Sequence, residues 1–100
     1  MILVRNVFQI KFGKMKEVLS LWRDGQEMMR KAGQPTGRLL TDITGTYYTF
    51  VLEMEYESLD AFEKGRPSGT MADEWSKFYA RFCEYVVTGH REILSIVVPK

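Results

Sequence analysis

The fold is decided by one stretch, Tyr47-Tyr48-Thr49-Phe50-Val51-Leu52-Glu53-Met54-Glu55-Tyr56. Its even positions are all apolar or aromatic, whereas its odd positions from Thr49 onward mix Thr49 and Val51 with Glu53 and Glu55. A period of two in aromatic and branched residues predicts a strand that turns one face to a core. Because the second face is only half polar, we expect it to be the surface through which the protein associates.

Residues 2–12 alternate in the same way and predict another strand. Asn6 is the one polar residue on its core face, among Ile2, Val4, Phe8 and Ile10. The period then changes to that of a helix, because the next apolar residues recur at intervals of three and four. These residues are Met15, Val18, Leu19, Trp22 and Met29. Gly33 followed by Pro35 predicts the end of this helix.

The remaining elements are predicted from turn and cap residues. A less regular strand covers residues 38–43, and the tight connection 44–46 joins it to the strand at 47–56 as a hairpin. Ser58 caps a short helix that points Leu59 and Phe62 inward. Thr70 and Asp73 form a capping pair that opens a longer helix. We expect this helix to end at 88–89 and the last strand to cover residues 90–98.

This order of elements is strand, helix, strand, strand, helix pair, strand. With right-handed crossovers it predicts an α+β, ferredoxin-like βαββαβ fold in which a four-stranded antiparallel sheet has its helices on one face. The strands at 2–12 and 47–56 then lie in the middle of the sheet. One hundred residues suffice for one modest core, so we expect a single domain over residues 1–100.

Helices on one face leave the other face of the sheet bare. A bare antiparallel face is normally mostly polar, but this one mixes branched apolar residues with charges of both signs. Its residues include Leu3, Arg5, Val7, Thr49, Val51 and Glu53. Arg5 and Glu53 are placed to pair across the two strands. We therefore predict a homodimer through this face; the alternative is a monomer with a partly apolar sheet.

Composition excludes several classes of protein. Hydrophobic residues are 45% and charged residues 27% of the chain, and the formal net charge of +1 gives no long-range attraction to nucleic acid. No apolar run approaches the ~20 residues that cross a bilayer, and the amino terminus does not resemble a signal peptide. The single cysteine, Cys83, excludes an internal disulfide and suits a reducing compartment, so we expect a cytoplasmic protein.

The chain resembles the dimeric α/β-barrel superfamily in its element order and in two passages. These are Val4-Arg5-Asn6-Val7-Phe8-Gln9-Ile10 and Leu52-Glu53-Met54-Glu55-Tyr56-Glu57-Ser58-Leu59-Asp60-Ala61-Phe62. The superfamily includes antibiotic-biosynthesis-type monooxygenases, haem-degrading monooxygenases, stress-responsive barrel proteins and the NIPSNAP group. The resemblance implies two ferredoxin-like sheets packed face to face, and it supports fold more than activity.

Asn6 is the first candidate site residue, because a buried amide without partners costs roughly 1–3 kcal/mol. In haem-degrading relatives, an asparagine on the first strand lines the substrate cleft with a tryptophan and a histidine. This sequence departs from that pattern: Gly65 stands near the expected tryptophan, and no histidine lies in the second helical region. Trp75 could substitute in space for the tryptophan. The ordinary alternative is an asparagine bonded to nearby backbone.

The aromatic residues at helical spacing are the second candidate. They line either a pocket for a flat apolar molecule or a filled core. We expect the ligand-binding residues to be Asn6, Phe8, Trp22, Phe62, Trp75 and Phe78. Cofactor-independent monooxygenases of the superfamily work through such pockets, because the substrate itself reduces oxygen. The sequence thus favours a small-molecule-binding protein, with oxygenation or isomerisation of an aromatic compound as its chemistry.

Two alternatives remain open: a non-catalytic homodimeric structural or regulatory protein with a filled core, and, more weakly, a haem-degrading monooxygenase. No cofactor and no metal site are expected, because the one histidine, His90, has no partner ligands near it in sequence. Cys83 is expected in the core. The segment 66–70 could hold an anion before a helix, although an ordinary turn is favoured.

Overall fold

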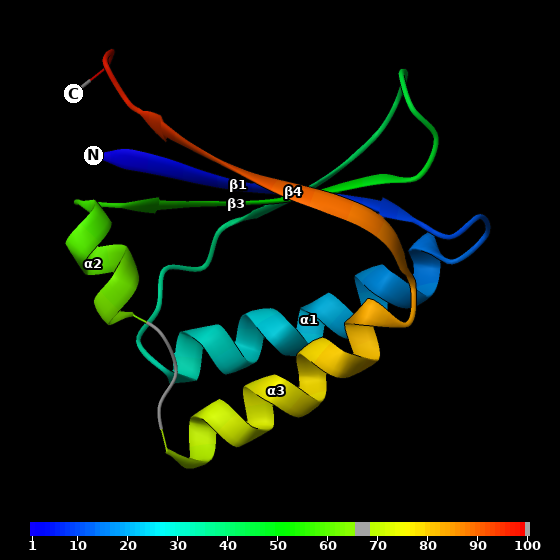
Figure 1. Ribbon diagram of the computed structural model, residues 1–100, viewed down its shortest axis with the longest axis horizontal. Coiled ribbons are helices and arrows are strands. Elements are labelled where there is room, and N and C mark those ends of the chain that lie inside the picture. Colours follow the sequence, from blue (N-terminus) through cyan, green and yellow to red (C-terminus); the bar gives the residue numbers. More distant parts are fainter. Residues whose placement is uncertain (66–68, 100) are drawn as a thin grey trace.

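Four antiparallel strands form one sheet in the order β2-β3-β1-β4 in the computed structural model, which describes residues 1–65 and 69–99. The elements, in chain order, are β1 (Ile2–Ile10), α1 (Met15–Lys31), β2 (Arg38–Thr41), β3 (Thr49–Tyr56), α2 (Leu59–Lys64), α3 (Thr70–Cys83) and β4 (Val86–Ser95). Helices α1 and α3 lie on the same side of the sheet, and α2 lies beside the end of β3 (Figure 1). The predicted ferredoxin-like α+β fold, with β1 and β3 in the middle, is confirmed.

Strand pairing assigns each side chain to a face, because directly opposite residues in an antiparallel pair point the same way. Asn6 pairs with Leu52 on β3 and with Arg91 on β4, so these three share the face toward the helices. Arg5 pairs with Glu53 and Glu92 on the opposite face, which we call the open face. Both predicted faces of β1 and β3 are therefore correct.

The core lies between the helix-facing side of the sheet and the inner stripes of α1 and α3. Trp22, Phe50 and Phe82 are the largest fully buried side chains. The Trp22 ring meets Phe82 edge to face at 5.3 Å between centroids, which is a favoured geometry for aromatic pairs. The aromatic stripes predicted from helical spacing thus do form the centre of the molecule.

The junction between α3 and β4 differs from the prediction. The helix ends at Cys83 and β4 begins at Val86, so residues 88–89 lie inside the strand and do not end the helix. Gly89 pairs with Phe8, and a Cβ at position 89 would lie 2.7 Å from Cδ1 of the Phe8 ring. This glycine therefore makes room for a ring on the neighbouring strand.

The two caps predicted around the short helix and the long helix have opposite outcomes. Ser58 does cap α2, since its hydroxyl accepts a hydrogen bond from the Ala61 amide at 3.1 Å. At α3 the cap position is occupied by Gly69, with no side-chain cap, and Thr70 is already helical. The predicted Thr70–Asp73 capping pair is wrong.

Two predicted core positions are at the surface. Leu59 is 56% exposed, because it stands in the first turn of a helix that has no buried residue. Cys83 is also exposed, since Tyr79 and Phe82 supply the inward contacts of the last turn of α3. The predictions for Leu59 and Cys83 assumed that the buried face of each helix extends to these residues, and it does not.

Candidate functional site

A cavity of about 530 Å³ lies between the helix-facing side of the sheet and the three helices. Its aromatic lining consists of Phe8, Trp22, Tyr56, Phe62, Trp75 and Tyr79. A smaller hollow of about 290 Å³ runs along β4, and it shares Asn6, Phe8, Tyr79 and Arg91 with the cavity. Size and lining are those of sites that bind small organic molecules.

The residues expected to bind a ligand all line this cavity except Phe78. Phe78 is buried in the core, with its ring 4.9 Å from Trp22 and packed over Gly25. Trp75 stacks on Phe78 at 5.3 Å, so the core ring supports a ring of the cavity wall. The geometry brings together side chains from β1, α1, α2 and α3; their role in binding stays a prediction.

Asn6 is buried, and its partner is a side chain from β4. Its Oδ1 accepts a hydrogen bond from Nε of Arg91 at 2.7 Å. Because Oδ1 is the acceptor, the Asn6 amide nitrogen is left as a donor on the cavity wall. The alternative of an amide satisfied by nearby backbone does not describe this residue.

Arg91 is the site residue that the sequence prediction missed. Its guanidinium carbon lies 5.4 Å from the centroid of the Phe62 ring, a cation–π distance, and the residue lines both hollows. The alternation of β4 was the available signal, because pairing β4 with β1 in register puts Arg91 opposite Asn6. The sequence prediction assigned no register to the last strand, so it did not place Arg91 opposite Asn6.

Two tyrosines on the cavity wall are neutral hydrogen-bonding groups. Burial raises the pKa of Tyr56 and the pKa of Tyr79 above their ordinary value, although the charge of Arg91 acts in the opposite direction on both. At neutral pH both are therefore protonated phenols, and neither is ionised to act as a base. The Tyr56 hydroxyl donates to Sδ of Met54 at 3.7 Å. Among the described residues that line the cavity there is no carboxylate and no imidazole.

Trp22 carries a buried donor next to the cavity. Its Nε1 is buried, and it has no hydrogen-bond partner within the described residues. A buried polar group without a partner is rare in folded proteins, since it loses its hydrogen bonds to water. Trp22 thus contributes the side of its ring to the cavity wall, while its Nε1 lies below that surface.

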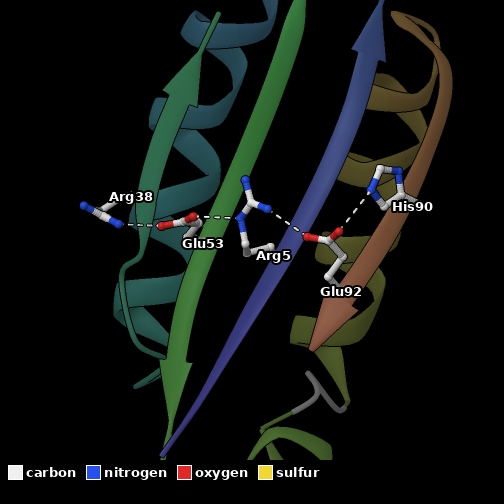
Figure 2. A network of polar contacts seen from close by, with 5 residues as sticks. All are labelled: Arg5, Arg38, Glu53, His90 and Glu92. Atoms are coloured by element: carbon white, nitrogen blue, oxygen red, sulfur yellow. Dashed lines mark hydrogen bonds and ion pairs between the residues drawn. The ribbon is translucent and has the colours of Figure 1, made fainter. Parts of the chain in front are cut away.

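The open face of the sheet carries a row of charges across all four strands, which we call the ladder (Figure 2). Glu53 accepts from Arg38 at 2.6 Å and from Arg5 at 2.9 Å, and Arg5 also donates to Glu92 at 2.7 Å. Nε2 of His90 lies 3.8 Å from Glu92 at the end of the ladder. The predicted Arg5–Glu53 pair is confirmed, and the row is longer than the sequence suggested.

No cluster of three metal-ligating side chains occurs in residues 1–65 and 69–99. His90 stands at the end of the ladder and lines the smaller hollow, but it does not line the larger cavity. The anion site considered at 66–70 falls mostly on residues 66–68, which are outside the described part of the chain.

Comparison with known proteins gives a consistent family. A family model described as NIPSNAP matches residues 5–98. The chain is similar to a NIPSNAP family protein from Agrobacterium tumefaciens, with 24% identity, a TM-score of 0.82 and coverage of 99% of this chain and 88% of that chain. It is also similar to a NIPSNAP domain protein from Burkholderia xenovorans, with 20% identity, a TM-score of 0.81 and coverage of 100% and 98%.

A third similar structure is SnoaB, a cofactor-independent oxygenase from Streptomyces nogalater. It shares 12% identity with this chain over 99% of this chain and 97% of its own, with a TM-score of 0.74, so the likeness is one of fold. No curated protein matches the sequence. Among the described residues, no helix is long and apolar enough to span a bilayer.

Proposed function

The chain belongs to the NIPSNAP family, and from that premise we propose that it binds a flat, apolar aromatic molecule in the cavity between sheet and helices. The observation that carries this proposal is the cavity itself, about 530 Å³ of space walled by aromatic rings. A filled core, as in a purely structural homodimer, would leave no such space. We propose Asn6, Phe8, Trp22, Phe62 and Trp75 as the binding residues.

Cofactor-independent oxygenation is the chemistry that fits this cavity best. In such a reaction an acidic ring CH₂ loses a proton to water or hydroxide that enters the cavity, the carbanion reduces O₂, and a C–O bond forms. Cleavage of the O–O bond then leaves a carbonyl on the carbon and releases the second oxygen as water. The protein has to hold the substrate and stabilise its oxyanion, and the donors of Arg91 and Asn6 suit that task.

Isomerisation receives less support than oxygenation. Moving a proton between two carbons requires a side chain that takes it up and returns it. Among the described lining residues the cavity has no carboxylate or imidazole for this purpose, and its tyrosines are neutral. Haem degradation receives little support either, because the one histidine of the sequence, His90, lines the smaller hollow and not the larger cavity.

Anthrone tests this function, because it is flat, tricyclic and has one acidic CH₂. We expect saturable binding that raises the melting temperature, and protein-dependent O₂ uptake that matches the anthraquinone formed. The Asn6→Ala and Trp75→Phe variants should bind anthrone more weakly while keeping the wild-type circular dichroism. The absence of saturable binding up to the solubility limit would contradict the proposal.

We also propose that the protein is a homodimer through the open face of the sheet. The ladder pairs its charges within one chain, so it can be desolvated at lower cost than lone charges. Val7 pairs with Val51, and Leu40 with the same Val51, to form an apolar row beside it. The exposed thiol of Cys83 suits a reducing environment, which supports a cytoplasmic location.

A further inference from the structure

We propose that the cavity selects aromatic monoanions, and that Arg91 is the residue that recognises the anionic group. This inference rests on the proposed function and deepens it, since it names the charge of the ligand and the side chain that selects it. The ligand would place its ring system among the aromatic residues of the cavity. Its carboxylate or ionised oxygen would lie against Arg91, where the two hollows meet.

The charge balance of the cavity is the first argument. Arg91 is the only permanently charged residue among the described residues that line the larger cavity. Three other arginines, Arg5, Arg30 and Arg38, each pair with a glutamate. Arg91 makes no ion pair with any described residue, and its hydrogen bond goes to a neutral amide. Arg91 is exposed to solvent and therefore accessible to a ligand, and a positive charge without a counter-charge attracts an anion.

The position of the guanidinium is the second argument. Asn6 holds Nε at 2.7 Å, and the Phe62 ring lies 5.4 Å from the guanidinium carbon. The two terminal nitrogens make no hydrogen bond to the described residues. They are the part of a guanidinium that forms paired, parallel hydrogen bonds to a carboxylate. Arg91 is thus oriented by its neighbours with its binding atoms unused.

The excess of donors is the third argument. Burial raises the pKa of Tyr79, so its phenol remains protonated, and its hydroxyl makes no hydrogen bond to a described residue. The amide nitrogen of Asn6 adds another donor, because its oxygen is taken by Arg91. An oxyanion accepts several hydrogen bonds at once, whereas a neutral apolar ligand leaves these donors unsatisfied. The cavity is therefore better matched to an anion than to a neutral hydrocarbon.

A matched pair of probes, 2-naphthoate and 2-naphthamide, separates charge from shape. Binding of each would be measured by calorimetry at pH 7 to the wild-type protein and to Arg91→Met, Arg91→Lys and Arg23→Met. Arg23 is exposed on α1 and lines neither hollow, so its substitution removes the same net charge elsewhere. Circular dichroism melts show whether each variant is folded.

We expect the wild-type protein to bind naphthoate at least about tenfold more tightly than naphthamide, as a charge-assisted hydrogen bond implies. Arg91→Met should abolish this preference while changing naphthamide affinity by less than about threefold. Arg91→Lys should keep part of the preference, because it retains charge without the planar fork. Arg23→Met should retain the wild-type preference.

The outcomes separate the two proposals. Equal affinity of the wild-type protein for both probes would overturn the selection of anions and leave aromatic binding intact. Equal loss of both ligands in Arg91→Met and Arg91→Lys would assign Arg91 a structural role only, and would also overturn the inference. Failure of both probes to bind the wild-type protein would overturn the proposed function, and the inference with it.

Discussion

At the scale of single residues, Asn6 shows what alternation in a sequence can reveal. One polar residue in a row of apolar ones had to find a partner, and the partner is Arg91. The sequence did not reveal Arg91, because its place depends on how β4 pairs with β1, and the two residues are 85 positions apart. The helical aromatic stripe likewise predicted which rings gather, but it did not separate the core ring Phe78 from the cavity ring Trp75.

Changing Asn6 to aspartate tests the pairing of these two residues. Asn6→Asp has nearly the same shape, but it places a carboxylate 2.7 Å from the Arg91 Nε and neutralises it. We expect the preference for naphthoate over naphthamide to disappear or reverse, while naphthamide still binds. The same calorimetric titrations measure the affinity of Asn6→Asp for both probes. Undiminished binding of naphthoate by Asn6→Asp would show that the anion lies elsewhere.

Glu53 makes the free energy of unfolding depend on pH in the acidic range. Burial pushes the pKa of Glu53 upward, but hydrogen bonds from Arg38 and Arg5 outweigh burial and hold it below the ordinary value. Its contribution to stability is therefore complete above the unfolded-state pKa of about 4.3 and is lost as the pH falls through the lower folded-state pKa. Glu53→Gln should destabilise the protein by about 1–3 kcal/mol at pH 7.

Urea unfolding at pH 7, 5, 4 and 3 measures this effect (pH values chosen to bracket roughly 4.3). The difference between wild type and Glu53→Gln should shrink toward the lowest pH, because the wild-type carboxylate is then protonated as well. Glu57→Gln, at an exposed position, removes the same charge and serves as the control. A difference that stays constant down to pH 3 would contradict the role of the ladder.

At the scale of elements, the contact between α1 and α3 explains a residue that looks unfavourable in the sequence. Glycine inside a helix costs about 1 kcal/mol relative to alanine, so Gly25→Ala in α1 would ordinarily stabilise it. The Cβ of an alanine would overlap the Phe78 ring of α3 and lie 2.9 Å from Cε3 of Trp22. We expect Gly25→Ala to destabilise the protein by about 1–3 kcal/mol through overpacking.

Thermal and urea unfolding of Gly25→Ala provide the measurement, and Ser20→Ala is the control, because Ser20 is exposed on the same helix. A Gly25→Ala variant as stable as Ser20→Ala or more stable would show that the helices separate at little cost. In that case the wall formed by Trp75 on Phe78 would also be less rigid than the ring stacking implies.

Elements with a long, regular period were predicted best. Apolar residues recur with a period of two along β1 and β3, and with a period of about three and a half along α1. Burial of one face of each element follows from that period. The end of α3 and the start of β4 were wrong because Gly89 was taken as a helix stop, while its actual role is to accommodate the Phe8 ring. The sequence around Gly89 does not indicate that the Phe8 ring of β1 packs against it.

At the scale of the whole molecule, the open face decides the state of association. The proposed homodimer should give twice the chain mass of 11.7 kDa in light scattering at micromolar concentration. Val7→Asp and Leu94→Asp place a charge on the open face and should give monomers, whereas Ala80→Asp on the exposed side of α3 should not. A wild-type protein that is monomeric under these conditions would refute the interface.

Strand β4 carries Arg91 toward the cavity and Glu92 into the ladder, because consecutive residues of a strand point in opposite directions. A displacement of β4 therefore moves residues of the cavity and residues of the open face together. If occupancy of the cavity tightens self-association by some factor, thermodynamic reciprocity requires self-association to tighten occupancy by the same factor. Dilution of the protein, which dissociates the dimer, would then also weaken ligand binding. The coupling would arise from the alternating side-chain directions of one edge strand.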